Sequence, residues 1–472
     1  MTVNPADSAI FGGLFGSEAM RVLFSDRQRL QNMLDVEAAL ARTEARIGII
    51  PQKAAEAISA AAAIDRVSFA EIATSTLVVG YPVVALVKAL GAAAGDDAAR
   101  YVHWGATTQD IVDTALVLQI RAGLDLIERD IITVGRALAE KAVRHRADVM
   151  AGRSHLQHAL PITFGYKCAV WLAPLLDAIE RLRQLRPRVL RVQFGGAVGT
   201  LASLGTGGRA VTAGLAQELG LAAPDAPWHV DRAGLVETAS FLGLVCGSLG
   251  KFATDVILLM QTEIGEVLEP YQAGRGGSST MPQKRNPIAS EYIIAAARGV
   301  HALVPLLLGA MAQDHERATG PWQSEQLALP QIFVLTSGAL AHAKTLAEGM
   351  TVDAERMRRN LDSTGGLILA EAVMMALAEK IGRGAAHDAV EHACARAIAA
   401  QCRLGDILAE DAAITAHLDP PTLARLADPA NYVGEAGAIV DRVVGRAREV
   451  LGTDDGSVYV EGSERHHAKD AP

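Results

Sequence analysis

The sequence predicts a fold built from packed helices. Half of the residues are apolar but only 4% are aromatic, and alanine, leucine and glycine predominate. One segment repeats apolar residues at alternating steps of three and four, a spacing typical of a helix packed in a bundle. A length of 472 residues exceeds one ordinary core, so we expect two or three domains.

The first hundred residues are predicted to form a small helical domain. An alanine-rich helix spans residues 25–47, and the glycine and proline in residues 48–51 end it. A second break falls at Gly80, Tyr81 and Pro82. The apolar stripe of the first helix consists of Leu30, Met33, Leu34, Leu40 and Ile47.

A long bundle helix is predicted to begin soon after His103. Thr107 or Thr108 is suited to cap its N-terminus, and the helix continues from about residue 109 to about residue 146. Free N–H groups and two hydroxyls at such an end can bind a carboxylate. Simple capping explains the same residues equally well.

Two histidines, His155 and His158, lie just ahead of the next predicted helix, at about residues 164–186. Three residues apart, they would share one face of a helix, which can suggest a metal site. No acidic residue accompanies them at ligand spacing, so we predict no metal. A structural histidine is the simpler alternative, but a histidine beside an anion site can transfer a proton near pH 7.

The glycine-rich run at residues 195–200 follows no strand pattern, so we expect a tight connection between helices and no dinucleotide site. The helix after it carries the apolar repeat, which we interpret as core: Leu242, Val245, Leu249, Phe252, Val256 and Leu259. This helix is predicted to end in Gln261, Thr262 and Glu263, and Gln261 and Glu263 are polar residues near the predicted start of the active site.

The least ordinary stretch is AGRGGSSTMPQKRNP, residues 273–287. Three glycines precede Ser278, Ser279 and a threonine, and Lys284 with two arginines gives a local charge of +3 in a chain of net charge −9. Glycine lets the backbone approach a ligand, and successive free N–H groups form a nest for an anion. A hydroxyl beside those donors and an ammonium can act as a base. The alternative is a basic surface loop.

The remaining chain is predicted to be helical almost to its end. A helix resumes at about residues 286–308, and Arg317 follows it in the segment DHERATG. Its guanidinium can bind two carboxylate oxygens at once, although a surface ion pair is equally compatible with the sequence. Shorter helices follow from about residue 351, and the polar tail after about residue 452 is expected to be disordered.

Composition argues against several other classes of protein. A net charge of −9 gives no footprint for nucleic acid. The most apolar windows are short or interrupted, so no membrane span is predicted. No signal-peptide pattern is present at the N-terminus, and the four cysteines show no metal-ligand or CxxC spacing. We therefore expect a cytoplasmic protein with reduced cysteines.

The run GSSTMPQKRNP, residues 277–287, resembles the signature of the fumarase/aspartase superfamily at every fixed position. Further blocks carry the resemblance from about residue 15 to about residue 444, among them GATTQD, LQHALPITFG and QFGGAVGTLASLG. Within that superfamily the chain is most similar to 3-carboxy-cis,cis-muconate cycloisomerases.

The resemblance implies an all-α fold of three helical domains with a central long up-and-down bundle. The corresponding ranges are residues 1–102, 103–350 and 351–452, followed by the tail 453–472. It also implies a homotetramer whose active sites each draw on three subunits, a small polycarboxylate substrate, and no metal or organic cofactor.

The resemblance also implies roles for particular residues. Ser278 would be the acid or base acting at carbon, Lys284 would hold its charge, and His158 would be the second acid/base group. Asn286 would bind a substrate carboxylate. The full set expected to contact substrate is His103, Thr107, Thr108, Arg153, His155, Gln261, Ser279, Asn286 and Arg317.

The chain departs from the pattern of muconate enzymes at four places: Tyr81–Pro82 for Asn-Ser, His155 for tryptophan, Gln283 for histidine, and residues 323–327 for His-Ala-Glu-Trp-Glu. These departures leave an epimerase or C–N lyase acting on an aspartate-type aminopolycarboxylate, such as iminodisuccinate, as the rival function. A non-catalytic helical oligomer is a third alternative.

Overall fold

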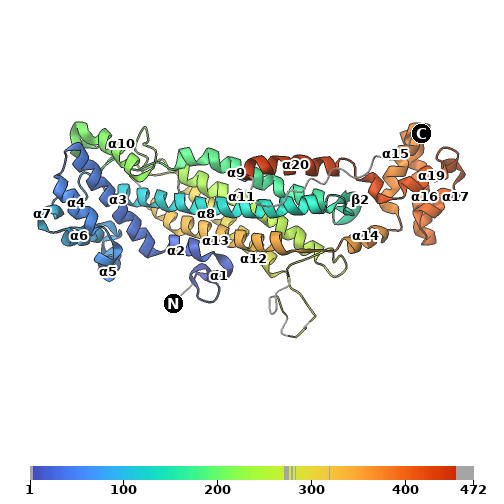
Figure 1. Ribbon diagram of the computed structural model, residues 1–472, viewed down its shortest axis with the longest axis horizontal. Coiled ribbons are helices and arrows are strands. Elements are labelled where there is room, and N and C mark those ends of the chain that lie inside the picture. Colours follow the sequence, from blue (N-terminus) through green and yellow to red (C-terminus); the bar gives the residue numbers. More distant parts are fainter. Residues whose placement is uncertain (1–3, 271–275, 278–279, 282, 318, 453–472) are drawn as a thin grey trace, which may run out of the picture. The chain divides into compact units, whose positions relative to one another are not determined.

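The computed structural model describes residues 4–270, 276–277, 280–281, 283–317 and 319–452. Helices make up most of this part of the chain, and the all-α prediction is confirmed (Figure 1). The chain divides into two compact units. The first comprises Met1–Val134, Asp177–Glu263 and Val267–Thr351, and the second comprises Gly135–Leu176, Ile264–Glu266 and Val352–Pro472. The three domain ranges expected from the resemblance stay a prediction.

Two long helices contain boundaries between the units, namely α8 (Thr108–Arg144) and α9 (Phe164–Val189). The other α-helices of the first unit are α1 (Gly12–Phe15), α2 (Glu18–Leu23), α3 (Asp26–Ile47), α4 (Gln52–Ala61), α5 (Phe69–Val79), α6 (Val83–Ala94), α7 (Asp96–Ala99), α10 (Gly208–Leu219), α11 (Ala233–Leu259), α12 (Ile288–Gly309) and α13 (Pro321–Gly349). Short 3-10 turns η1 (Pro5–Asp7), η2 (Ile64–Arg66) and η3 (Ala202–Gly207), with strand β3 (Val267–Leu268), complete it.

The second unit contains a hairpin and a set of shorter helices. Its hairpin strands are β1 (Val149–Ser154) and β2 (Gln157–Thr163), and β4 (Thr351–Val352) lies at the unit boundary. The helices are α14 (Ala354–Asp362), α15 (Ala370–Ile381), α16 (Arg383–Ala400), α17 (Leu404–Glu410), α18 (Ala412–Thr415), α19 (Pro420–Leu426) and α20 (Ala436–Leu451), with 3-10 turns η4 (Leu367–Leu369) and η5 (Pro429–Tyr432). The predicted change to shorter helices after residue 351 is confirmed.

The predicted boundaries of α3 are also confirmed. The Ser25 hydroxyl caps its N-terminus by accepting a hydrogen bond from the N–H of Gln28 (3.3 Å), and Gly48 ends it at φ 85°. Four members of its predicted stripe are buried, but Ile47 is 37% exposed. Ile47 is the last residue of the helix and lies beyond the part of α3 that the hydrophobic core covers.

The apolar repeat of α11 is core, as predicted. All six of its members are at most 3% exposed: Leu242, Val245, Leu249, Phe252, Val256 and Leu259. Helices α11, α12 and α13 pack side by side in the first unit (Figure 1). By length and composition, α11 and α12 would each qualify as a membrane span, contrary to our expectation that no such segment exists. In α11 the apolar surface is used for helix packing.

The histidine pair lies on a hairpin, not on one helix face. His155 and Leu156 have φ values of 52° and 63°, and they connect Ser154 to its strand partner Gln157. Two successive positive φ angles characterise the tight hairpin turns whose twist matches paired strands. His158 therefore lies on β2 opposite Arg153 of β1, while His155 occupies the exposed turn.

Candidate functional site

The signature loop is closed by pairing between its two ends. Gly277 bridges Arg285 in antiparallel fashion, and the N–H of Asn286 donates to the carbonyl of Gly276 (3.1 Å). Gly276 has φ 67°, and a Cβ placed there would lie 2.7 Å from the carbonyl oxygen of Asn286. Only glycine allows this close approach. Ser278 and Ser279, the predicted acid/base and its neighbour, lie outside the described residues.

The C-terminal end of the loop is anchored to α12. Arg285 donates to the carbonyl of Glu269 (2.8 Å). The buried carboxylate of Glu269 in turn accepts from the N–H groups of Ala289 (3.1 Å) and Ser290 (2.9 Å). A carboxylate at a helix N-terminus satisfies free N–H groups and is favoured by the helix dipole. The C-terminal end of the loop is therefore held to Glu269 and to the start of α12.

Lys284, a predicted catalytic residue of the loop, and Asn286, a predicted substrate contact, are both accessible at least in part. The side chain of Lys284 is exposed, and its N–H donates to the carbonyl of Met281 (3.0 Å) in a local turn. Asn286 is half-buried beside the pairing that closes the loop. An exposed ammonium on a short, anchored loop can pair with a ligand carboxylate or with a developing alkoxide.

The N-terminus of α8 brings together two of the predicted carboxylate contacts. The Arg317 guanidinium donates to the Thr107 hydroxyl, although the two residues are 210 positions apart in sequence. Arg317 is exposed, so it remains open to a ligand. Thr107 immediately precedes Thr108, the first residue of α8, and either was a predicted cap. Hydroxyls, free N–H groups and a guanidinium therefore share one helix end, the arrangement that favours a carboxylate.

His103 adds a further positive group near this helix. Its Nδ1 lies 2.6 Å from an oxygen of Glu37, which is almost fully buried. Burial disfavours the charged imidazole, but the Glu37 carboxylate outweighs it and raises the pKa of His103 above its ordinary value. His103 also has φ 62°, a conformation uncommon for a residue with a side chain. His103 is therefore paired with a buried carboxylate that favours its protonated form.

A buried carboxylate that our sequence reasoning missed holds this helix end in place. Asp110 is fully buried and accepts hydrogen bonds from the Thr107 N–H (3.0 Å) and from His229 Nε2 (2.7 Å). It also accepts from the N–H groups of Gly195 (3.0 Å) and Gly196 (2.9 Å). The glycine run, correctly predicted as a helix connection, is therefore fastened to the start of α8.

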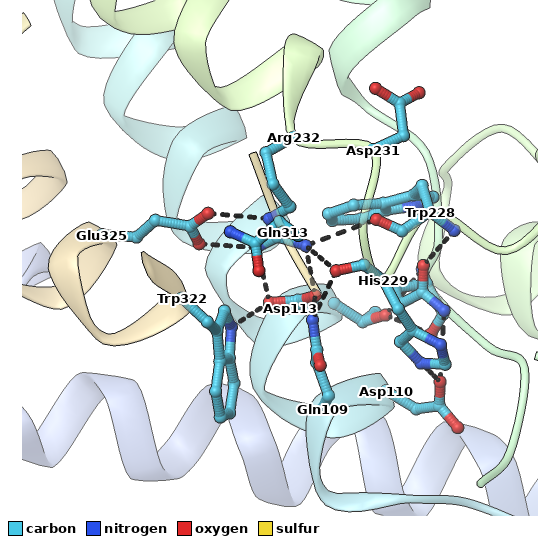
Figure 2. A network of polar contacts seen from close by, with 12 residues as sticks. Gln109, Asp110, Asp113, Trp228, His229, Asp231, Arg232, Gln313, Trp322 and Glu325 are labelled. Atoms are coloured by element: carbon cyan, nitrogen blue, oxygen red, sulfur yellow. Dashed lines mark hydrogen bonds and ion pairs between the residues drawn. The ribbon is translucent and has the colours of Figure 1, made fainter. Parts of the chain in front are cut away.

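A second missed network lies one turn further along α8. Arg232, which is 1% exposed, forms paired hydrogen bonds to Asp113 and to Glu325, all at 2.6–3.0 Å (Figure 2). The indole N–H of Trp322 donates to Asp113 as well (3.1 Å). Burial raises the pKa of Glu325 even though Arg232 opposes the shift. Two carboxylates share one guanidinium here, so the network leaves no buried cation for a substrate.

The sequence contains a signal for both networks. Asp110 and Asp113 are three residues apart on α8, and His229 and Arg232 repeat that spacing just before α11. Residues three apart on a helix share a face. Acidic residues within a largely apolar stretch, here residues 110–118, matched by a basic pair elsewhere, indicate buried ion pairs, since such charges are seldom buried alone.

The hairpin of the second unit holds the other predicted acid/base group. Arg153 makes two hydrogen bonds to the buried carboxylate of Glu266, at 2.9 and 2.7 Å. His158 lies opposite Arg153, and its Nδ1 is buried without a hydrogen-bond partner among the described residues. Burial, and then the charge of Arg153, lowers the pKa of His158, with Glu266 opposing. The imidazole is therefore neutral near pH 7 and can accept a proton.

The remaining predicted contacts are exposed. His155 lies in the hairpin turn. The helix α11 ends at Leu259, earlier than predicted, so Gln261 lies two residues beyond it. Among the described residues, no contact joins either side chain to another predicted site residue, so the roles of His155 and Gln261 stay predictions. Among the described residues, the one His/Asp/Glu group close enough to share an ion is His387, Asp388 and Glu391, which is wholly exposed on α16.

A protein-family model described as "Lyase" matches residues 16–301, more than half of the chain. A second, described as "Adenylosuccinate lyase C-terminus", matches residues 366–443. The chain belongs to the fumarase/aspartase superfamily. The superfamily resemblance predicted from the signature run and the other matching segments of the sequence is therefore confirmed.

Named relatives and solved structures share nearly the whole length of this superfamily member. The chain is 53% identical over 447 residues to a 3-carboxy-cis,cis-muconate cycloisomerase of Pseudomonas aeruginosa, covering 94% of this chain and 97% of the relative. The crystal structure of a 3-carboxy-cis,cis-muconate lactonizing enzyme from Pseudomonas putida superimposes with a TM-score of 0.91 at 49% identity, covering 94% and 100% of the two chains. A fumarate lyase from Mesorhizobium sp. BNC1 gives a TM-score of 0.86 at 48% identity, covering 91% and 98%.

Proposed function

We propose that this protein converts 3-carboxy-cis,cis-muconate into its γ-lactone. The observation that carries the proposal is the 53% identity to the Pseudomonas aeruginosa cycloisomerase over 94% of the chain. A small polycarboxylate also suits the positive groups described above: Lys284 on the signature loop, Arg317 at the start of α8, and His103. Each can pair with a carboxylate oxygen.

The proposed reaction balances without any redox partner or cofactor. A substrate carboxylate oxygen forms a bond to a carbon of the diene, and the π electron pair of that double bond moves to the carbon beside a second carboxylate. The Ser278 hydroxyl delivers a proton to that carbon, and water returns a proton to serine. A trianion becomes a dianion, so one proton is consumed for each lactone formed.

The difficult part of this reaction is the charge of the intermediate. Electron density on the carbon spreads into its carboxylate, which becomes doubly charged. Preorganised N–H donors and cations aimed at that position stabilise the charge more than water does. Lys284 and the loop N–H groups have this role in our proposal, Asn286 holds a carboxylate, and His158 is the second acid/base group.

A homotetramer with shared sites is part of the proposal. Only 28% of the most apolar window of α12 is buried within the chain, compared with 50% for α11. Large apolar side chains near its C-terminus are exposed: Leu306, Leu308 and Met311. Contiguous exposed apolar surface marks an interaction site, and further copies of the same bundle are suited to cover it.

The test is a panel of polycarboxylates assayed with the wild-type protein and with Ser278→Ala. We expect the ultraviolet absorbance of 3-carboxymuconate to disappear with the wild type. In Ser278→Ala, kcat should fall by about 10²–10⁴-fold, the usual contribution of one acid/base group. Ser75→Ala, which removes a hydroxyl from α5, should leave kcat unchanged. A folded, oligomeric wild type without activity on 3-carboxymuconate would contradict the proposal.

A second candidate function is epimerisation or C–N cleavage of an aspartate-type aminopolycarboxylate. It is favoured by the 48% identity to a structure titled as a fumarate lyase, and by Gln283, which matches argininosuccinate lyases. The same panel separates the candidates. Iminodisuccinate that releases fumarate indicates a lyase, whereas iminodisuccinate that takes up deuterium without releasing fumarate indicates an epimerase.

A further inference from the structure

A buried carboxylate on α3 pairs with His103, one of the residues predicted to contact substrate. The side chain of Glu37 is 1% exposed, and its Oε1 lies 2.6 Å from Nδ1 of His103. Its Oε2 is buried without a hydrogen-bond partner among the described residues. Within this part of the chain, His103 is therefore the one hydrogen-bond partner of the Glu37 carboxylate.

The two ring nitrogens of His103 have different surroundings. Nδ1 is held by Glu37, whereas no hydrogen bond among the described residues engages Nε2, and the side chain is 20% exposed. A carboxylate at one ring nitrogen fixes the orientation of the ring and leaves the other nitrogen for a ligand. When the ring is protonated, Nε2–H can donate a charge-assisted hydrogen bond to an anion.

The groups that set the charge of His103 come from two helices. Burial disfavours the charged ring, but Glu37 of α3 and Asp110 of α8 outweigh it and raise the pKa of His103. A third element packs here, the connection at residues 195–207, and its sequence contains no titratable side chain. Asp110 is already engaged by backbone N–H groups and by His229, so Glu37 is the direct counter-ion.

A second buried acid on α3 does not serve His103. Glu44 follows Glu37 by two helical turns, is fully buried, and has neither carboxylate oxygen hydrogen-bonded within the described residues. Burial, and then the charge of Glu37, raises the pKa of Glu44 to about 8. Glu44 is therefore mostly neutral at pH 7, and it adds little charge to the pair.

We propose that Glu37 is a positioning residue for substrate binding, which fixes the ring of His103 and keeps it positively charged so that Nε2–H binds a substrate carboxylate. Glu37 is too deeply buried to touch the substrate, so it acts through His103. The inference rests on the proposed function, because it requires the substrate to be a small polycarboxylate.

This arrangement sets an alkaline limit on binding. His103 loses its proton as the pH rises through its raised pKa, so the affinity for a polycarboxylate should fall above that pH. Glu37→Gln keeps the shape of the side chain and an oxygen that can accept from Nδ1–H, but it removes the charge. The pKa of His103 should therefore be lower in Glu37→Gln, and the fall in affinity should begin at a lower pH.

Calorimetric titration of the full-length protein with tricarballylate tests the proposal over a range of pH. This tricarboxylate is saturated, so it cannot undergo the proposed addition to a double bond, and the measurement needs no turnover. Near pH 7 we expect Glu37→Gln to weaken binding by about 10-fold, within the range for a hydrogen bond to a charged group. In assays with 3-carboxymuconate, the same variant should raise KM by a similar factor and leave kcat nearly unchanged.

Two controls separate the charge of Glu37 from its packing. Glu44→Gln is the same isosteric change on the same helix, but Glu44 is already mostly neutral at pH 7, so binding there should be unchanged. In a His103→Gln background, Glu37→Gln should cause no further loss, because its effect passes through His103. A merely structural role of Glu37 would give the same loss in both backgrounds.

The proposal is overturned if the wild type does not bind tricarballylate, or if its affinity does not fall at alkaline pH. It is also overturned if Glu37→Gln binds as tightly as the wild type at every pH, or if its loss persists in the His103→Gln background. Binding that follows the expected pattern without turnover of 3-carboxymuconate would contradict the lactonisation and support the role of Glu37.

Discussion

At the scale of single residues, the protonation of His158 follows from its surroundings. Its Nδ1 is buried without a partner, and the neighbouring Arg153 disfavours a second positive charge. Both effects lower the pKa, so the neutral imidazole is the resting form at neutral pH. A neutral imidazole can accept a proton from water, and the proposed lactonisation consumes one proton for each lactone formed.

This arrangement predicts the pH dependence of activity. Because the neutral imidazole is the active form, kcat/KM should fall as the pH drops through the lowered pKa of His158, below its ordinary value of 6.5. Arg153→Gln should move this acid limb to higher pH, since it removes the positive neighbour. A pH profile of kcat/KM checks both statements. A limb at or above 6.5 in the wild type would count against a role for His158.

Single residues also show which part of the site the sequence could predict. Ser278, Lys284 and Asn286 are recognisable because their order along one loop carries the pattern. Asp110 and Arg232 were missed, because the partners that bury them lie far away in sequence. Gly195 and His229 are 85 and 119 residues from Asp110, and Glu325 and Asp113 are 93 and 119 residues from Arg232. The sequence offers only the spacing of three residues in each pair. Arg153 was expected at the substrate; the structure pairs it with Glu266, and its contact with substrate stays a prediction.

At the scale of elements, the signature loop depends on the pairing of its ends. Gly276 must adopt a positive φ, and its neighbour Gly277 must bridge Arg285. Gly276 and Gly277 are the two residues before Ser278, which we propose as the acid or base. The backbone at residues 276–277 is therefore held by contacts that only glycine permits at residue 276.

We expect Gly276→Ala to lower kcat while leaving the fold intact. A Cβ would lie 2.7 Å from the Asn286 carbonyl oxygen, and a left-handed residue costs about 1–2 kcal/mol, so the loop should open locally. Gly384→Ala on α16, where a Cβ meets nothing within 4 Å, is the matched control and should retain full activity. Steady-state kinetics with thermal unfolding checks both. Unchanged kcat in Gly276→Ala would show that the closed loop end is not needed.

The elements differ in how far local sequence determines them. Helix α3 carries Ser25 and Gly48 at its ends, and α11 carries an unbroken apolar repeat, so both were predicted. The β1–β2 hairpin was missed. Its turn residues are His155 and Leu156, which lack the Asn-Gly or Asp-Gly signal of such turns. Tertiary contacts, including Arg153 with Glu266, hold it instead.

At the scale of the whole molecule, the proposed tetramer makes a direct prediction. If several chains build each site, an inactive Ser278→Ala protein and an inactive His158→Ala protein should complement each other. Mixed and reassembled, they should regain part of the wild-type activity, because some sites combine an intact Ser278 with an intact His158. Activity of the mixture no greater than the sum of the two variants would indicate that each chain builds its own site.

The most direct test of the account is to follow the reaction of 3-carboxymuconate in D₂O by NMR. Our mechanism delivers one solvent-derived proton from Ser278 to the carbon beside a carboxylate. It predicts a γ-lactone with one deuterium at that carbon, formed by the wild type and almost absent with Ser278→Ala. A lactone without deuterium at that carbon, or equal rates for the two proteins, would contradict it.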